Sequence, residues 1–354
     1  MNIGIPKEIK PLEGRVSLTP DACHQLVEAG HIVFVEENAG VLSGYSNSDY
    51  QKAGCRIEAT ATDLYGNAEL IVKVKEPIEA DLNYLKKHHL LFCFLHLAAE
   101  TALMSKLRDI GLTAIAFETV QSKNGELPLL LPMSVIAGRL SGQIGANLLY
   151  ETEQGKGILL GGIPTTERGN VVVLGAGNAG AAAVDVVASL GANVKVFDLS
   201  SQKLSALQSK YANVTGLKPN LRQLQNAVSS ADLLIGAVLV AGARAPVLVS
   251  EAMINAMQPG SVVIDIAVDQ GGCIATTHAT NYLNPTYQVN GVTHFAVTNM
   301  PGAVPRTSTQ ALSAAILPFV EKLAEGQLEQ SEELIAGINI RHGEVVHPAL
   351  VPLA

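Results

Sequence analysis

The fold of this chain is decided by residues 171–198, which read VVVLGAGNAGAAAVDVVASLGANVKVFD. The stretch opens with a run of β-branched residues, which is typical of a strand buried on both faces. Gly175, Gly177 and Gly180 then form the pattern G-x-G-x-x-G, and an alanine-rich segment predicts a helix that leads to a second strand at 194–197. The order strand, glycine turn, helix, strand predicts a Rossmann-type α/β unit.

The three glycines predict what this unit binds. The first permits a tight turn, the second lets the backbone approach a pyrophosphate, and the third lets helix and strand pack closely. The beginning of the helix offers unpaired N–H groups to phosphate oxygens. Asp198 ends the second strand, where a carboxylate would bind the adenosine ribose hydroxyls and repel a 2′-phosphate. We therefore expect a dinucleotide site that prefers NAD to NADP.

The composition limits the class of protein. The chain has 354 residues, of which 48% are hydrophobic and 16% charged, with 32 glycines, and this is typical of a two-domain α/β enzyme. Its net charge of −8 argues against nucleic acid or an anionic membrane as a partner. We find no signal peptide, no transmembrane stretch and no cysteine spacing that predicts a metal or redox site. These features predict a cytoplasmic protein without a metal.

The first 120 residues predict a parallel sheet with polar residues at the ends of its strands. Strands are expected at 3–6, 31–35, 69–75, 90–95 and 113–117, and a helix at 21–29 that Thr19 and Pro20 begin. Arg15 lies in the loop after the first strand, and Lys75 and His96 come at the ends of two others. Because the carboxyl ends of parallel strands share one edge, we expect these side chains to converge. Lys73 lies on the same strand face as Lys75 and competes with it.

The rest of the chain predicts a second α/β domain between two long helices. The first helix is expected at 134–151 with Ser134 as its cap, and the second at 309–325, where Pro318 should kink it. Between them, strands are expected at 231–240, 261–268 and 294–297. The tail, 327–354, is expected to rejoin the first domain. The predicted domains are thus 1–130 plus 308–354 for the substrate and 131–307 for the dinucleotide.

Four side chains are candidates for hydride-transfer chemistry between two such domains, and each has a plain structural alternative. Arg15 can grip a carboxylate, or it can be a solvated loop arginine. Lys75 can orient a carbonyl or carboxylate, or it can be an exposed lysine at a strand end. His96 suits proton exchange but is as often structural, and turn chemistry explains Asp269 equally well. Asp265, inside a strand, is expected to be structural.

Short blocks in register from residue 3 to about residue 320 carry a family signal. They are IGIPKEIK (3–10), VKVKEP (72–77), LHLA (95–98), PMSVIAGRLS (132–141), LLGGIP (159–164), IGAVL (235–239), DIAVDQGGC (265–273) and NMPGAVPRTST (299–309). Together these blocks resemble the L-alanine dehydrogenase family. The related NAD-binding subunits of proton-translocating transhydrogenase share the start and the fold but lack the histidine of LHLA. His96 is therefore the residue that best separates the two.

The resemblance implies an enzyme with two Rossmann-like α/β domains, parallel sheets and two long crossover helices. It implies NAD-dependent, reversible oxidative deamination of L-alanine to pyruvate and ammonium, carried out by a homohexamer. His96 and Asp269 would be catalytic, and Arg15 and Lys75 would bind the substrate. The cofactor would be bound by Ser134, Gly175, Gly177, Asn178, Ala179, Gly180, Asp198, Lys203, Asn220, Val238, Leu239, Ile266, Ala267, Val268, Asp269, His278, Val297, Thr298, Asn299 and Met300.

Two residues differ from the pattern of this family, and two other functions remain as alternatives. Asn220 stands where the family commonly has a serine, and His278 where many members have an arginine. One alternative is a dehydrogenase of another amino or imino acid on the same scaffold. The other is a transhydrogenase-type NAD-binding module whose activity requires a partner protein.

Overall fold

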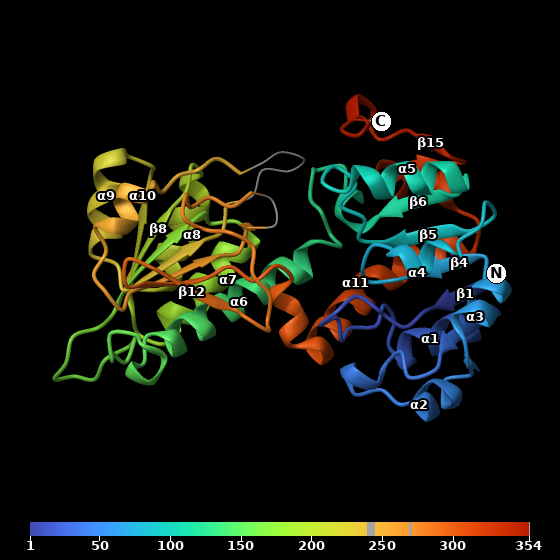
Figure 1. Cartoon of the computed structure of the whole chain (residues 1–354), viewed down its shortest axis with the longest axis horizontal. Coiled ribbons are helices and arrows are strands. Elements are labelled where there is room, and N and C mark those ends of the chain that lie inside the picture. The colour runs from blue at the N-terminus through green and yellow to red at the C-terminus, as the bar shows by residue number, and fades with distance from the viewer. Residues whose placement is uncertain (239–244, 269–270, 354) are drawn as a thin grey trace. The chain divides into compact units, whose positions relative to one another are not determined.

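Two sheets organise the chain, each in its own unit (Figure 1). The computed structural model describes residues 1–238, 245–268 and 271–353. Unit 1 comprises Met1–Met133 and Val304–Ala354, and unit 2 comprises Ser134–Ala303. The chain thus enters unit 2 in the first turn of α6 (Leu131–Leu148) and returns to unit 1 just before α11 (Pro305–Ala324).

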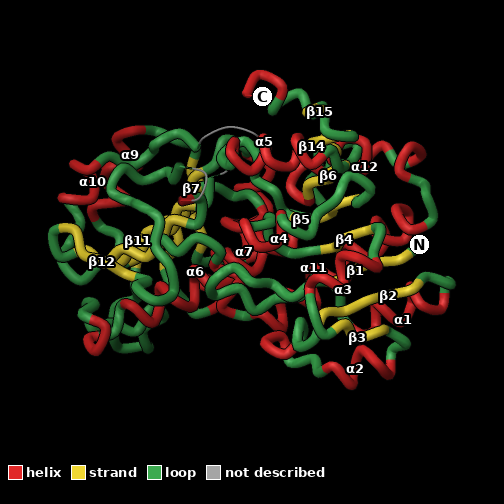
Figure 2. Tube along the Cα trace, turned by 45° about the vertical axis from the view of Figure 1, so that its right-hand side comes forward, coloured by secondary structure: helices red, strands yellow, loops and turns green. Residues whose placement is uncertain are grey.

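Unit 1 contains an eight-stranded sheet in the order β15-β14-β6-β5-β4-β1-β2-β3 (Figure 2). Its parallel strands are β1 (Asn2–Ile5), β2 (Ile32–Glu36), β3 (Arg56–Glu58), β4 (Leu70–Val72), β5 (Leu90–Cys93) and β6 (Thr113–Ala116). Its helices include α1 (Pro20–Glu28), α2 (Asn47–Lys52), α3 (Ala61–Asn67), α4 (Glu79–Leu82), α5 (Thr101–Ile110) and α12 (Glu332–Gly337). The predicted start of α1 is confirmed, because the Thr19 hydroxyl accepts a hydrogen bond from Ala22 N and Pro20 is the first helical residue.

The tail completes this sheet with two strands that the sequence did not predict. β14 (Ile338–Arg341) pairs antiparallel with β6, and β15 (Glu344–Val345) pairs antiparallel with β14. His342 and Gly343, both at positive φ, form the two-residue turn between them. The tail thus pairs with the sheet of unit 1, which is mixed at this edge and parallel elsewhere.

Unit 2 contains a seven-stranded sheet in the order β12-β13-β11-β10-β7-β8-β9. Its strands are β7 (Asn170–Leu174), β8 (Asn193–Phe197), β9 (Val214–Leu217), β10 (Leu233–Gly236), β11 (Val262–Asp265), β12 (Thr286–Val289) and β13 (Val292–Phe295). Among the described strands of this sheet, only β12 runs antiparallel to its neighbour. The helices are α6, α7 (Asn178–Ser189), α8 (Ser201–Lys210), α9 (Leu221–Ser229) and α10 (Glu251–Asn255).

Alternating side chains on the central strands of unit 2 form its core. Val172 and Leu174 of β7 pack in one apolar cluster with residues of α9 and α10, among them Val228 and Ile254. The opposite face of the same strands is buried as well, since Val171 and Val173 are at most 1% exposed. A strand that is apolar on both faces is what the β-branched run before the glycines predicts.

The two long helices differ from their predicted bounds. Helix α6 begins at Leu131, so the prediction that Ser134 caps it is wrong; Pro132 fits the first turn, where no backbone N–H is required. Helix α11 begins at Pro305 and continues through Pro318 to Ala324, although the proline ring removes one backbone hydrogen bond there. Strand β4 ends at Val72, short of the expected residue 75.

Glycines on α6 allow a very close approach to α7. A Cβ atom added at Gly138 would lie 2.0 Å from the carbonyl oxygen of Ala179, and one added at Gly142 would lie 2.8 Å from Val186. The first obstacle is backbone, which cannot move aside as a side chain can. These two helices therefore depend on the missing Cβ atoms for their contact.

We predict that Gly138→Ala lowers the free energy of unfolding by about 1–3 kcal/mol, because the added methyl overpacks against the Ala179 carbonyl. Gly66→Ala is the matched control, since Gly66 lies in α3 and a Cβ there meets nothing within 4 Å. That control should stabilise the protein by about 0.5–1 kcal/mol through helix propensity. Calorimetric Tm values of the two variants test the difference, and equal shifts would contradict the close approach.

Candidate functional site

The predicted substrate residues of unit 1 follow three neighbouring strands. Arg15 lies after β1, Lys75 after β4 and His96 after β5, and these strands are adjacent in the order β5-β4-β1. All three strands are parallel, so their carboxyl ends share one edge of the sheet. This edge is where open α/β sheets bind ligands.

Arg15 is buried and held in place by a carboxylate. Its exposed fraction is 3%, so the interpretation as a solvated loop arginine is wrong. Glu13 accepts hydrogen bonds from Nε at 2.7 Å and Nη2 at 2.5 Å, and Nη1 lies 3.2 Å from the sulfur of Met133. A two-pronged contact of this kind fixes the plane of the guanidinium. The Arg15 side chain is therefore rigid and oriented before any ligand arrives.

The structure separates the two lysines of VKVKEP. Lys73 is 1% exposed, and its Nζ lies 3.1 Å from Asp81 and 3.7 Å from Glu8. Burial alone would lower the pKa of Lys73, but the two carboxylates outweigh it and raise that pKa. Lys73 is therefore a structural cation whose charge is already compensated.

Lys75 differs from Lys73 in both its surroundings and the direction of its pKa shift. Its side chain is half-buried, and the described residues offer its ammonium group no hydrogen bond or ion pair. Burial is the main reason why the pKa of Lys75 is lowered, with a further contribution from the Arg15 charge. Between the two lysines, Lys75 is the one that can bind a carbonyl or carboxylate oxygen.

His96 has a strained backbone and an ordered ring. Its φ is +52°, a backbone conformation that residues other than glycine rarely adopt. Its N–H donates to Oε1 of Glu118 at 2.6 Å, and its Nδ1 lies 4.0 Å from the same oxygen. The ring is parallel to that of Phe94, with centroids 5.8 Å apart. The side chain remains 35% exposed, so a ligand can reach it.

Glu118 is a residue that the sequence analysis missed. It belongs to a 3-10 turn, Phe117–Thr119, directly after β6, the neighbour of β5 in the sheet. The sequence carries a signal for Glu118, because it is a polar residue at the end of a buried strand. The same signal identified Lys75 and His96. A glutamate at the end of the strand expected at 113–117 lacks the distinctive chemistry of histidine, so its position alone does not single it out.

The glycine turn of unit 2 has the geometry that a pyrophosphate requires. Gly175 has a φ of +94°, and a Cβ added at Gly180 would lie 1.9 Å from the Gly175 carbonyl oxygen. Among the described residues, a Cβ at Gly177 would meet nothing within 4 Å, so they leave open space in front of the turn. No described side chain caps α7, so its first N–H groups are available to an anion. The turn therefore fits a dinucleotide.

Asp198 joins the end of β8 to this turn. Its Oδ2 accepts a hydrogen bond from Ala176 N at 2.6 Å, and its Oδ1 accepts one from Ser200 N at 2.7 Å. Each carboxylate oxygen has a second lone pair with which it can accept from a ribose hydroxyl. The carboxylate is thus fixed beside the glycine turn, where a ribose next to the pyrophosphate would lie.

Several of the other predicted cofactor residues follow the carboxyl ends of strands in unit 2. Val238 follows β10, and Lys203 lies in the first turn of α8. Ile266, Ala267 and Val268 follow β11, and Val297, Thr298, Asn299 and Met300 follow β13. Asn178 and Ala179 begin α7, and Ser134 lies in α6. Leu239 and Asp269 lie outside the described residues.

The two departures from the family pattern have clear local roles. Asn220 is the N-cap of α9, and its Oδ1 accepts from Gln223 N at 3.2 Å. Serine and asparagine cap helices equally well, so this exchange preserves the cap. The His278 ring stacks on Tyr287 with centroids 3.9 Å apart, and His278 N donates to the Tyr287 hydroxyl. His278 therefore presents an aromatic ring stack at this position.

Asp265 has the structural role expected of it. Its carboxylate is fully buried and accepts hydrogen bonds from Ala267 N, Cys273 N and the Thr277 hydroxyl at 2.8–3.1 Å. These contacts tie Ala267 to Cys273 and Thr277 through one carboxylate. Burial raises the pKa of Asp265, while its hydrogen bonds act in the opposite direction.

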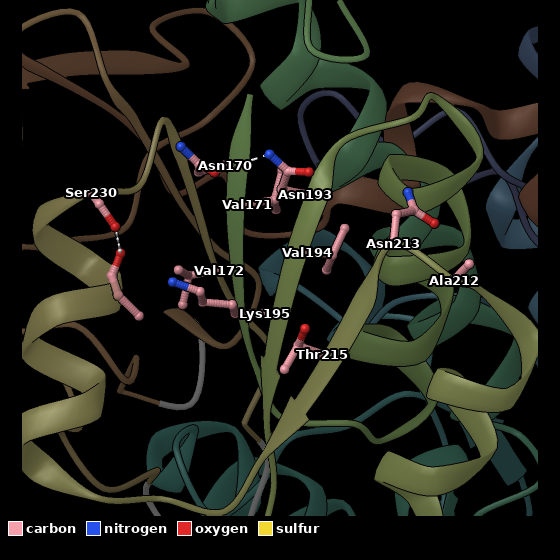
Figure 3. A pocket seen from close by; sticks show the side chains of 11 residues that line it. Asn170, Val171, Val172, Asn193, Val194, Lys195, Ala212, Asn213, Thr215 and Ser230 are labelled. Carbon is pink, nitrogen blue, oxygen red and sulfur yellow. Dashed lines mark hydrogen bonds between the residues drawn. The ribbon is translucent and has the colours of Figure 1, made fainter. Parts of the chain in front are cut away.

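A separate cavity of about 240 Å³ lies at the other edge of this sheet (Figure 3). It is lined by the amino-terminal ends of β7, β8 and β9, where Asn170 and Asn193 are hydrogen-bonded to each other. Lys195 lies between Val172 and Thr215 on the sheet face. This cavity is distinct from the predicted cofactor residues, which follow the carboxyl ends of the strands.

Within the described residues we find no cluster of three histidine, cysteine or carboxylate side chains that could hold a metal ion. No described helix is both long and apolar enough to cross a membrane.

The sequence matches two family models that together span most of it. Residues 4–137 match the alanine dehydrogenase/PNT N-terminal domain, and residues 141–348 match the alanine dehydrogenase/PNT C-terminal domain. An alanine dehydrogenase from Methanococcus maripaludis is 45% identical over 99% of this chain and 95% of its own length. A solved L-alanine dehydrogenase has a TM-score of 0.96 at 48% identity, with full coverage of both chains. A solved transhydrogenase from Sinorhizobium meliloti has a TM-score of 0.84 at 26% identity, covering 99% of this chain and 100% of that one.

Neighbouring lysines should respond in opposite ways to the same substitution. We predict that Lys73→Met lowers the free energy of unfolding by about 3–5 kcal/mol, because it leaves the buried charges of Glu8 and Asp81 uncompensated. Lys75→Met should raise the Tm at neutral pH, because it removes a cation whose burial is unfavourable.

The increase in Tm expected for Lys75→Met should depend on pH, and the lowered pKa of Lys75 gives the direction. The pKa of Lys75 is lowered in the folded state, so the folded protein binds fewer protons than the unfolded one between that pKa and 10.5. The free energy of unfolding of the wild type therefore rises with pH across this window. The difference in Tm between Lys75→Met and the wild type should become smaller. Thermal unfolding between neutral and alkaline pH measures both effects, and a constant advantage would contradict the lowered pKa.

Proposed function

The chain belongs to the alanine dehydrogenase/PNT family, and from this premise we propose that it catalyses the reversible oxidative deamination of L-alanine to pyruvate and ammonium. The observation that carries the proposal is the set of Arg15, Lys75 and His96 at adjacent strand ends of unit 1. The chain is an amino-acid dehydrogenase with a nicotinamide dinucleotide cofactor. That the cofactor is NAD and that L-alanine is its preferred substrate are proposals.

The residues of unit 2 support the choice of NAD. The glycine turn and the beginning of α7 would hold the pyrophosphate, and Asp198 would accept hydrogen bonds from the adenosine ribose. A phosphate in place of the ribose hydroxyl would meet the Asp198 carboxylate and be repelled. When bound, the nicotinamide ring accepts the hydride that leaves Cα of the substrate.

The residues of unit 1 would bind and orient the amino acid. Arg15, whose plane Glu13 fixes, would pair with the substrate carboxylate. Lys75 would hold its ammonium beside the oxygen of the substrate carbonyl, where negative charge develops. A group that is already desolvated and has no ion pair among the described residues loses little when it binds this oxygen.

His96 would move the protons of the hydrolytic half-reaction. After hydride and a proton have left the amino acid, water adds to the carbon of the resulting imine, and His96 takes the proton that this water loses. His96 then returns this proton to the nitrogen, which leaves as ammonia. The former water oxygen gives up its remaining proton to His96 as it becomes the carbonyl oxygen of pyruvate. Asp269, outside the described residues, would assist by placing water or ammonia.

We further propose that the enzyme is a cytoplasmic homo-oligomer, and specifically the hexamer that the family resemblance implies. The cytoplasmic location agrees with the four cysteines, all of which are buried free thiols.

The activity is tested by the near-ultraviolet absorbance of NADH. We expect NADH to form from L-alanine and NAD, and to be consumed with pyruvate and ammonium. His96→Ala should lower turnover by about 10²–10⁴-fold, the usual contribution of a general acid–base, with little change in NADH affinity measured by calorimetry.

The alternatives give different results in the same assay. Turnover on another amino acid in a substrate panel, but not on alanine, would indicate a related dehydrogenase. NADH binding without turnover on any amino acid, and turnover only with an NADP-binding partner, would indicate a transhydrogenase-type module.

Cofactor preference is tested at Asp198. We predict that Asp198→Ala lowers the ratio of kcat/KM for NAD to that for NADP, because the repulsion of the 2′-phosphate is removed. Asp198→Asn is the matched control: it retains an acceptor for Ala176 N but loses the charge, so it should relax the preference with less loss of Tm. An unchanged preference in both variants would contradict the ribose role.

A further inference from the structure

We propose that Glu118 is the positioning residue of His96: it fixes the strained backbone of the histidine and turns Nδ1 toward itself, so that Nε2 is the nitrogen that exchanges a proton with the substrate. The inference rests on the proposed function, because it concerns the histidine to which that function assigns proton transfer. The two can nevertheless be tested separately.

The first observation is how Glu118 binds the backbone. Oε1 accepts from His96 N at 2.6 Å, and Oε1 and Oε2 each lie 3.2 Å from Leu95 N. Phe94 N still donates to the carbonyl oxygen of Val74, whereas the next two N–H groups donate to Glu118. The Glu118 carboxylate thus takes over from the sheet and anchors the two residues at which the chain leaves it.

The second observation is the conformation that this anchor holds. His96 has a φ of +52°, in the left-handed region that a Cβ atom makes unfavourable. Its carbonyl oxygen accepts from the N–H groups of Ala99 and Glu100 at 2.9 and 3.1 Å, and α5 begins directly afterwards. Such a conformation persists only where surrounding contacts fix it, and Glu118 provides the contacts on the amino-terminal side.

The third observation is the orientation of the ring. Nδ1 lies 4.0 Å from Oε1 of Glu118, and the ring is parallel to Phe94. Phe94 in turn packs edge-on against Phe117, the residue before Glu118, with centroids 5.1 Å apart. Glu118 and Phe117, the ring that supports Phe94, therefore come from one short segment. A carboxylate that faces Nδ1 favours the tautomer with hydrogen on that nitrogen, which leaves Nε2 as the proton acceptor.

The exposure of the two side chains indicates which of them meets the substrate. The Glu118 side chain is 16% exposed and the His96 side chain 35%. Glu118 already engages two backbone N–H groups, so it acts through His96 and need not touch the reacting atoms. The arrangement has the same logic as a buried carboxylate that orients a catalytic imidazole.

The test is a double-mutant cycle with Glu118→Gln and His96→Ala. Glutamine retains an oxygen for the backbone N–H groups but loses the charge that faces Nδ1. We expect Glu118→Gln alone to lower kcat by about tenfold or more, with a much smaller change in the KM for pyruvate. In the His96→Ala background it should change kcat by less than about twofold, because nothing remains to be positioned.

A matched control separates this effect from a loss of stability. Asp232 also binds a backbone N–H, that of Asn170, and pairs with a lysine, but at the amino-terminal edge of the unit 2 sheet. Asp232→Asn should lower Tm without changing kcat. Glu118→Asp, with a shorter side chain, is the second variant should glutamine prevent folding, and we expect it to lower kcat in the wild-type background only.

A spectroscopic measurement makes the outcome independent of turnover. In ¹⁵N-histidine-labelled enzyme, solid-state NMR with His96→Ala as the difference sample should show hydrogen on Nδ1 of neutral His96, and Glu118→Gln should remove this preference. An unchanged kcat, an equal loss of kcat in both backgrounds, or an unchanged tautomer would overturn the inference. Absence of alanine turnover in the wild type would instead overturn the proposed function, whatever the tautomer.

Discussion

Parallel pairing of strands is the constraint on which both halves of this protein depend. It places the carboxyl ends of β1, β4, β5 and β6 at one edge in unit 1, and those of β7, β8, β10 and β11 at one edge in unit 2. Strand pairing alone therefore makes neighbours of residues that are far apart in the sequence, even where their side chains do not touch. The loops at these edges must then satisfy N–H groups that the sheet no longer pairs, because buried backbone groups are rarely left without a partner.

Carboxylates perform this task at one strand end after another. Glu8 accepts from Val74 N, Glu118 from the N–H groups of Leu95 and His96, and Asp198 from Ala176 in the glycine turn. Asp265 closes the loop after β11 in the same way. Each of these carboxylates has a structural role, because it fixes the backbone at the end of a strand. Each also bears on function, because that backbone carries a side chain or an N–H group that we propose contacts a ligand. The desolvation that raises the pKa of Glu8 and Asp265 is the cost of using charged acceptors in the interior.

Much of the fold follows from local sequence, and the rest depends on contacts that no local pattern records. The cap of α1 and the glycine turn were predictable because every residue involved lies within one short segment. The β14–β15 hairpin was not, because its strands are short and gain their stability from pairing with β6, distant in the sequence. The difference between Lys73 and Lys75 was also hidden, since it depends on Asp81 and Glu8 rather than on strand alternation.

The same distinction explains why the cofactor is easier to predict than the reaction. The dinucleotide signal is contiguous: turn, helix and acid lie within residues 171–198, so one segment carries the whole argument. The signal for the reaction is distributed over the ends of β1, β4, β5 and β6, and its meaning depends on their order in the sheet. A single strand-end residue such as Glu118 is uninformative until β6 is known to lie beside β5. Positioning residues are for this reason the hardest to predict from sequence. Their side chains have no distinctive chemistry, and only the order of strands in the sheet shows which residue each of them orients.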